Sequence, residues 1–302
     1  MKFAIWPSFD RSWEETIALA RWAEANGFSG FWAADHLLVN GPDDSRPDDD
    51  VLECWSVLTA VGAAVPRVRL VSMVSPVSIH HPVVLTKRAI TADHVSGGRA
   101  VLGLGAGWQG NEHEAYGFDL LAVGPRVRRF AEALQVVHGM LRHDQVTFNG
   151  EYYQLDNVAC RPRPVGQLPI LIGSKGPRMA RLTARFADEW NTWGDTTQFA
   201  QRSAVVDTAC EVEGRDPASL RRSTQAMVFL IDTPAQRERA VGAATPGMSL
   251  VGTAGELIEL LHQYTALGVD EFAVPDFNLG SSAGERRERL ERLNAEVLAH
   301  VH

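Results

Sequence analysis

A histidine follows the second apolar segment of the chain that has the length of a strand. The segment FSGFWAADH ends in Asp35 and His36. An imidazole can take or give a proton near neutral pH, which suits general acid–base catalysis. We expect Asp35 to orient the ring rather than to act as a second base. The alternative is a histidine that only holds a loop in place.

A glycine-rich stretch, VLGLGAGWQGNEHEAYG, contains a G-x-G-x-x-G pattern at Gly105, Gly107 and Gly110. In dinucleotide-binding folds this pattern joins the first strand of a βαβ unit directly to its helix. Here three strand–helix units precede it, and polar residues followed by Gly117 predict that no helix begins at Gly110. We therefore interpret the match as chance spacing. The glycines instead predict a close approach of backbone at the end of a strand, beneath a long loop.

The tetrapeptide GSKG at Gly173–Gly176 follows another apolar segment, and a proline begins the next predicted helix. Exposed N–H groups at the positive end of a helix bind anions, and Lys175 and Arg178 would add charge. This turn predicts a phosphate site, the alternative being a plain tight turn. The tripeptide VGT at 251–253 is a second candidate, although Thr253 as a helix N-cap explains it fully.

Two other kinds of chemistry have weaker support. Glu112, His113 and Glu114 are adjacent on one loop, without the H-E-x-x-H spacing of a zinc site, so we expect no metal there. We expect Glu112 to pair with an arginine such as Arg126. Lys175, just past a strand, leaves a Schiff-base aldolase open as a non-redox, phosphate-binding alternative.

Apolar segments and helical patterns alternate along the whole chain and form eight strand–helix units in 302 residues. The strands are continuous apolar runs, as in parallel sheets covered on both faces. The sequence thus predicts an α/β fold, a single (β/α)₈ TIM barrel over residues 1–302, with an insertion at about 143–168. Asn149-Gly150 predicts a hairpin within this insertion. STQAMVFLID is predicted to be strand seven, without a break.

Composition excludes several classes of protein. The net charge is −8 and no Lys/Arg-rich run is present, so neither nucleic acid nor a membrane surface is an expected partner. No window approaches the about 18 apolar residues of a membrane span, and the first residues do not read as a signal peptide. The three isolated cysteines fit reduced thiols. We expect a cytoplasmic enzyme acting on a small molecule.

Several of these segments together resemble the luciferase-like monooxygenase superfamily of flavin- and deazaflavin-dependent barrel oxidoreductases. They are GFSGFWAADHLL, HVSGGRAVLGLGAGWQGNEHEAYG, GQLPILIGSKGPRMARLTARFADEWN, VTFNGEYYQL and SLVGTAGEL. GLGAGW, F-x-G-x-Y-Y and ADEWN are most similar to the branch that uses coenzyme F420, a 5-deazaflavin. The excess of 26 arginines over 3 lysines is typical of the GC-rich actinobacteria that commonly make this coenzyme. An FMN-dependent monooxygenase is the alternative, because FMN-using relatives share the scaffold.

The resemblance implies a role for individual residues. His36 would contact the deazaflavin ring and serve as acid/base, and a non-proline cis peptide at Ser72-Met73 would support the ring from behind. The loop at Gly173–Gly176 would hold the phosphate, Trp108 would lie beside the ring or the substrate, and the protein would be a homodimer. The implied cofactor-binding residues are Asp35, Ser72, Met73, Ser75, Gly105, Ala106, Gly107, Trp108, Gly173, Ser174, Lys175, Gly176 and Arg178. All of them should meet on one rim of the barrel.

Overall fold

Eight parallel strands close into a barrel in chain order. The computed structural model describes residues 1–8, 10–41, 43, 45–46 and 48–301. Around the barrel lie β1 (Lys2–Trp6), β2 (Gly30–Ala33), β3 (Arg69–Ser72), β5 (Ala100–Gly105), β8 (Ile170–Gly173), β9 (Glu189–Trp193), β10 (Arg221–Gln225) and β13 (Glu271–Pro275). β13 pairs with β1, and β3 pairs with β5, so the ring has no free edge. The short β4 (Ser75–Pro76) continues past β3 and also pairs with β5. The predicted barrel is confirmed.

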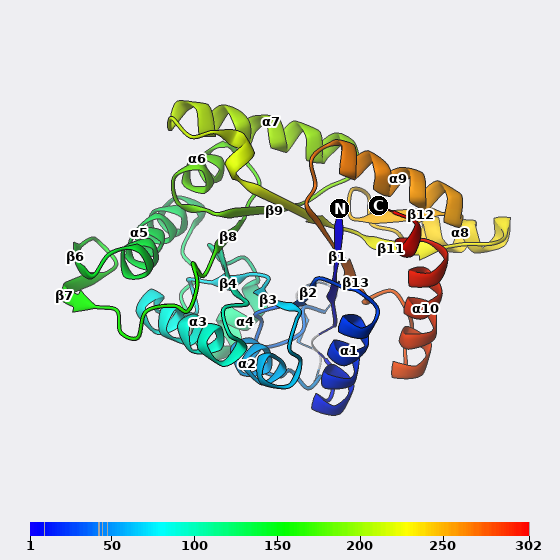
Figure 1. Ribbon diagram of the computed structural model, residues 1–302, viewed down its shortest axis with the longest axis horizontal. Coiled ribbons are helices and arrows are strands. Elements are labelled where there is room, and N and C mark those ends of the chain that lie inside the picture. Colours follow the sequence, from blue (N-terminus) through cyan, green and yellow to red (C-terminus); the bar gives the residue numbers. More distant parts are fainter. Residues whose placement is uncertain (9, 42, 44, 47, 302) are drawn as a thin grey trace.

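Helices surround this ring of strands (Figure 1). The α-helices in the described part of the chain are α1 (Trp13–Ala25), α2 (Cys54–Ala64), α3 (Pro82–Ser96), α4 (Gly110–Tyr116), α5 (Val123–Arg142), α6 (Pro177–Phe186), α7 (Thr196–Val212), α8 (Pro234–Ala243), α9 (Ala254–Ala266) and α10 (Ala283–Glu296). Capping fixes several of their starts: Ser12 accepts from the Glu15 N–H, and Thr253 and Glu256 form a reciprocal capping box.

The strands are apolar on both faces because both faces are buried. Trp6 and Trp32 belong to a cluster inside the barrel, whereas Ile5 and Phe31 pack outward against the helices. Neighbouring residues of a strand point to opposite faces, so a run without polar interruptions is what a covered parallel strand requires.

Two predictions about local structure are wrong. A helix does begin at Gly110: Gln109 has extended backbone at its N-cap, and Gly117, with φ +74°, ends the helix rather than marking a loop. The predicted strand seven breaks at Ala226 into β10 and β11 (Met227–Leu230). β11 leaves the barrel to pair with β12 (Ser249–Gly252), because an apolar run alone does not specify which partner it joins.

The predicted insertion carries a hairpin of β6 (Gln145–Asn149) and β7 (Gln154–Ala159), which lies beside α5 in Figure 1. Its connecting loop is 150–153, longer than the two residues of the sequence signal. The Glu132 carboxylate of α5 accepts from the N–H groups of Glu151 and Tyr152, both at 2.8 Å, and so holds the hairpin against the barrel.

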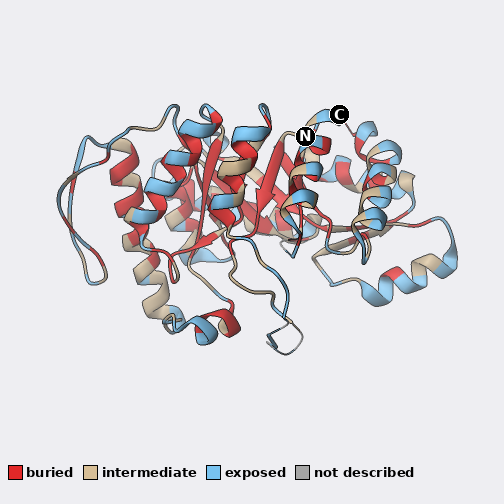
Figure 2. Ribbon diagram, turned by 90° about the horizontal axis from the view of Figure 1, so that it is seen from below, coloured by how far each residue is buried: buried red, intermediate tan, exposed pale blue. Residues whose placement is uncertain are grey.

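The two ends of the barrel differ. Figure 2 shows both chain termini at one end and the longer loops at the other. In the stretch 41–50, which is rich in Asp and Pro, residues 42, 44 and 47 lie outside the described residues. In the part of the chain that the structure describes, no helix combines the length and apolarity needed to cross a membrane.

Candidate active site

His36 lies just past β2 and is held by an acid from another unit of the barrel. Its Nδ1 is 3.0 Å from Glu112 Oε1, and Glu112 Oε2 accepts from the Leu37 N–H at 2.9 Å. An ionised carboxylate can only accept, so His36 Nδ1 donates and carries a proton. Glu112 is 1% exposed and comes from α4. This pair fixes both the orientation and the tautomer of the imidazole.

The predicted partner of Glu112 is therefore wrong. Arg126 donates instead to the carbonyl of Gly107 at 2.9 Å. The barrel brings His36 next to Glu112 although they are 76 positions apart, which local spacing does not reveal. Glu112 also takes the orienting role that we had expected of Asp35.

The neighbours of Glu112 point to separate partners rather than to one ion. His113 Nδ1 donates to the carbonyl of Gln109 at 2.6 Å, and its Nε2 accepts from Ser78 Oγ at 2.8 Å. Glu114 forms an ion pair with Arg46. These side chains hold α4 and the loops around it together.

Asp35 faces a different histidine. Its Oδ2 lies 3.0 Å from His80 Nε2, and both residues are buried. Burial acts to raise the pKa of Asp35, but the hydrogen bond and charge of His80, with smaller effects of Ser75 and His36, leave that pKa below its ordinary value. The Asp35–His80 pair thus joins the segments that follow β2 and β4. His81, the other histidine before Pro82, caps α3 as expected for the start of a helix.

The segment after β3 contains a cis peptide bond, between Met73 and Val74. The predicted position, Ser72-Met73, is wrong by one residue, since the motif does not distinguish adjacent bonds. The Ser72 hydroxyl accepts from the Gly103 N–H at 3.0 Å, and Ser75 Oγ accepts from Trp55 Nε1 at 2.9 Å. Both hydroxyls are buried and join neighbouring elements, so their contact with a cofactor stays a prediction.

Glycines at the ends of β5 and β8 leave room for Val74, a residue that sequence reasoning missed. A Cβ at Gly105 would lie 2.7 Å from Val74 Cγ2, and one at Gly173 would lie 3.3 Å from Val74 Cγ1. Gly107 has φ +92°, and a Cβ there would lie 2.1 Å from Ser78 Oγ, whereas Gly110 has open space. The pattern is thus not a dinucleotide fingerprint. Gly105 and Gly173 instead flank the partly exposed Val74, and we call this apolar surface, which suits a flat ring, the cradle.

An aromatic side chain stands beside this cradle. Trp108 is 62% exposed, and its ring lies edge-on to His36 with centroids 5.6 Å apart. Trp108 thus lies beside the part-buried His36, where it could contact a ligand that reaches the imidazole. Ala106 packs partly buried against the outer core.

The turn after β8 carries unmatched positive charge. Lys175, Gly176 and Arg178 are exposed at the start of α6. Lys175 and Arg178 form no ion pair with a carboxylate among the described residues, and neither does Arg202 of the neighbouring α7. Partial burial and the charge of Arg202 lower the pKa of Lys175. An anion would relieve this excess.

A cavity of about 420 Å³, open to solvent, lies behind this turn between α6 and α7 and is lined by Ser174, Gly176, Gln201 and Arg202, among others. Ser174 Oγ accepts from Trp190 Nε1 at 3.0 Å within it. The second phosphate candidate is less suitable. Glu256 accepts from the Thr253 N–H at 2.7 Å, so a carboxylate already occupies that helix start.

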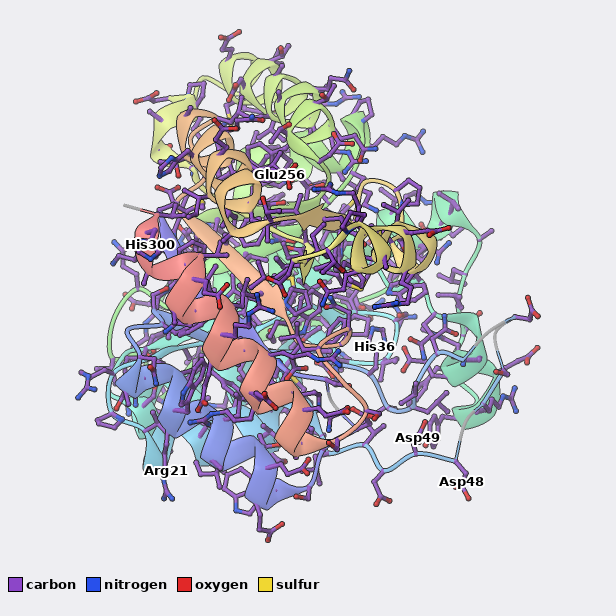
Figure 3. The ribbon with its side chains drawn as sticks, turned by 90° about the vertical axis from the view of Figure 1, so that its right-hand side faces the viewer. Arg21, His36, Asp48, Asp49, Glu256 and His300 are labelled. Carbon is purple, nitrogen blue, oxygen red and sulfur yellow. The ribbon has the colours of Figure 1, made fainter. Side chains whose placement is uncertain are left out.

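These features share one rim. β2, β3, β5 and β8 are parallel neighbours, so their carboxyl ends meet at the same end of the barrel. His36 and Ser174 follow two of these strands. In Figure 3, His36 lies toward the side from which the loop with Asp48 and Asp49 projects, away from His300. The expected convergence is what the barrel provides.

Comparison with known proteins agrees with this geometry. Residues 1–247 match the family described as luciferase-like monooxygenase. A relative from Nakamurella multipartita, named F420-dependent glucose-6-phosphate dehydrogenase, is 35% identical over 250 residues, which cover 77% of this chain and 72% of that protein. The F420-dependent hydroxymycolic acid dehydrogenase of Mycobacterium tuberculosis is 26% identical over 229 residues, covering 75% of this chain and 62% of that one.

The fold also matches solved structures. An F420-dependent secondary alcohol dehydrogenase, in complex with an F420-acetone adduct, superposes with a TM-score of 0.83. The match covers 99% of this chain and 98% of that one at 17% identity, which shows a common fold. The match over residues 1–247 and the relative that is 35% identical show that the chain belongs to the luciferase-like monooxygenase family.

Proposed function

We propose that this protein is a coenzyme F420-dependent oxidoreductase that transfers a hydride between the coenzyme and a small organic substrate. The observation that carries this proposal is the union, on one rim, of the His36–Glu112 pair, the cradle around Val74 and the cationic turn after β8. Relatives named for F420 dependence at 35% and 26% identity support the choice of coenzyme.

The residues present suit such a group. The surface around Val74, flanked by Gly105 and Gly173, would take the planar ring, with Trp108 covering it. Lys175 and Arg178, with the N–H groups at the start of α6, would hold the phosphate. Bound there, the deazaflavin supplies the hydride chemistry, and the protein supplies orientation and charge.

His36 handles the proton that accompanies the hydride. When an alcohol is oxidised, its carbon gives up a hydride and its hydroxyl gives up a proton, which leaves a carbonyl. Because Nδ1 donates to Glu112, the imidazole takes this proton on Nε2. Glu112 stabilises the resulting positive charge on the imidazole. In the reverse reaction, Nε2 of His36 returns the proton to the oxygen of the carbonyl substrate.

Binding experiments test the proposal directly. The purified chain is titrated with coenzyme F420 and with FMN, and binding is followed by quenching of tryptophan fluorescence. We expect coenzyme F420 to bind more tightly than FMN, and we expect the substitution K175A to weaken the binding of F420. K87A, which alters an exposed lysine of α3, serves as the matched control. Tight binding of FMN without binding of F420 would instead favour an FMN-dependent monooxygenase, the alternative that the family description offers.

Two further features belong to this proposal. From the resemblance to the family we infer that the protein is a homodimer. Sedimentation analysis of the purified chain, which measures its mass in solution, tests this. We also infer a cytoplasmic location, which fractionation of the producing cells would test.

A further inference from the structure

The residues proposed to bind the coenzyme occupy only one half of the carboxyl end of the barrel. The residues proposed to hold the ring and its phosphate follow β2, β3, β5 and β8. The strands are arranged in chain order, so β9, β10, β13 and β1 form the opposite half. A substrate that exchanges a hydride with the coenzyme across the mouth must lie against this half.

This second half is walled by aromatic rings. Trp6, at the end of β1, lies 5.6 Å from Trp193 of β9 and 5.2 Å from Phe277, which follows β13, between ring centroids. Trp6 and Trp193 belong to the cluster inside the barrel. Phe277 is 40% exposed. The wall therefore runs from the buried interior to the open mouth, and it suits an apolar body.

Two buried donors lie on the inner face of the same half. Trp6 is 7% exposed and Gln225 is 1% exposed, and neither Trp6 Nε1 nor Gln225 Nε2 has an acceptor among the described residues. Gln225 Oε1 accepts from Asn191 Nδ2 at 2.8 Å, which fixes the direction of the amide. Gln225 pairs in register with Ala273, a member of the inner cluster, so its side chain also points inward.

A buried donor without an acceptor destabilises the protein, because it has lost its hydrogen bond to water and gained none in return. A ligand oxygen that accepts from these N–H groups removes this destabilisation. Both groups are neutral donors, so they match a carbonyl, hydroxyl or ether oxygen.

The charges of this half are unsuited to a phosphate. The described residues that end or directly follow its strands include two acids, Asp195 and Asp276, and no cation. Asp276 forms a buried ion pair with Arg11 and accepts from the Ser8 N–H. Arg202 lies on the helix side of β9, in the cavity between α6 and α7. A phosphate dianion placed here would lie beside the acid Asp276, whose cation Arg11 is already paired with it.

We infer that the substrate is an uncharged alcohol or carbonyl compound with an apolar body. The body packs against Trp6, Trp193 and Phe277, and an oxygen accepts from Trp6 Nε1 and Gln225 Nε2. This inference rests on the proposed function. It separates the chain from its 35%-identical relative, whose name specifies a phosphorylated sugar.

A substrate panel tests the inference. Cyclohexanol, glucose and glucose 6-phosphate are offered with oxidised coenzyme, and cyclohexanone with reduced coenzyme, while the coenzyme absorbance is followed. We expect kcat/KM for the cyclohexanol–cyclohexanone pair to exceed that for glucose 6-phosphate by at least about tenfold, the value of one missing charge partner. A preference for glucose 6-phosphate would overturn the inference and leave the proposed function intact. Failure to bind the coenzyme at all would reject the proposed function itself.

Variants test the donors separately. W6F keeps an aromatic ring but removes the N–H, and Q225L removes the amide. Each should raise KM for cyclohexanone about 3- to 10-fold with little change in kcat. W22F is the matched control, because Trp22 packs on α1 against Phe28 and Arg287. Saturation-transfer NMR should show weaker contact with cyclohexanone for W6F and Q225L than for W22F. Unchanged KM and NMR contact in W6F and Q225L would refute the assignment.

Discussion

The two ends of the barrel treat buried charge in opposite ways. At the amino end, Arg69 and Arg221 lie between Glu189 and Glu271, with Arg69 Nη1 2.5 Å and Arg221 Nη2 3.3 Å from Glu271 Oε2. Two cations thus meet two anions. Burial acts to lower the pKa of Arg69, but the two carboxylates outweigh it and raise that pKa above its ordinary value. Each of these four charges therefore has a partner of opposite sign without a ligand.

At the carboxyl end, by contrast, several charges and buried donors have no partner among the described residues. Lys175, Arg178 and Arg202 have no carboxylate partner among the described residues, and the buried N–H groups of Trp6 and Gln225 have no acceptor there. We propose that the polar groups at the amino end serve stability, whereas the unpartnered groups at the carboxyl end serve binding. Substitutions at the two ends should therefore separate activity from stability.

The largest effect should come from His36. Replacing it in H36N removes the group that exchanges the proton, and kcat should fall by about 10²- to 10⁴-fold. Affinity for the coenzyme and the melting temperature should change little, because His36 is at the mouth rather than in the core. Steady-state kinetics and thermal unfolding measure the two quantities. The exposed His300, at the other end of the barrel, gives the control H300N, and equal kcat in both variants would contradict the proposed role.

The amino end should show the reverse pattern. R69M leaves Glu189 and Glu271 with Arg221 alone, and the free energy of unfolding should fall by about 3–5 kcal/mol. The kcat of the folded protein should be unchanged. Urea unfolding measures this loss. R237M breaks an exposed ion pair with Glu256 and should cost no more than about 1 kcal/mol. A loss in R69M as small as in R237M would mean that the amino end does not stabilise the barrel through its charges.

Two glycines of one motif should respond differently. G107A forces a side chain into backbone with φ +92° and against Ser78 Oγ, and should cost about 1–3 kcal/mol. It should also weaken coenzyme binding, since it distorts the cradle. G110A has open space in a helix and should change neither quantity. Unfolding and coenzyme titrations compare the pair, and equal behaviour of G107A and G110A would contradict the separate roles of the two glycines.

The sequence predicts the barrel because the barrel strands are largely buried on both faces, so that apolar runs alternate with helical patterns along the chain. It also placed His36 and the turn at Gly173–Gly176, since these follow apolar runs directly. Helix α4 escaped prediction because its final glycine looks the same in sequence as a glycine in a loop.

The partners of the site residues could not be predicted in the same way. The contact of His36 with Glu112 and the positions of Trp6 and Gln225 depend on strand register and on closure of the barrel. Val74 has no polar group to attract notice. Its role follows only from the missing side chains of Gly105 and Gly173 on neighbouring strands.

The smallest effect concerns two buried aspartates at the carboxyl end. Burial acts to raise the pKa of both. For Asp35, His80 with smaller effects of Ser75 and His36 leaves the pKa below its ordinary value, whereas for Asp276 burial prevails over Arg11 and its other partners and the pKa is raised. Asp35 therefore stabilises the fold above the ordinary aspartate pKa of about 3.9, and this contribution is lost as the pH falls through its lower folded pKa. The contribution of Asp276 has the opposite sign: it is present below about pH 3.9 and is lost as the pH rises through its higher folded pKa.

The variants D35N and D276N should consequently diverge from the wild type in opposite directions. The stability gap between wild type and D35N should narrow on acidification, and the gap between wild type and D276N should widen. Urea unfolding at a series of pH values measures both gaps. Because each variant removes one titrating carboxyl, the slopes isolate the two groups even if the loss of a partner for His80 or Arg11 adds a constant offset. Slopes of the same sign would mean that His80 does not set the charge of Asp35, and that the carboxyl end treats both acids alike.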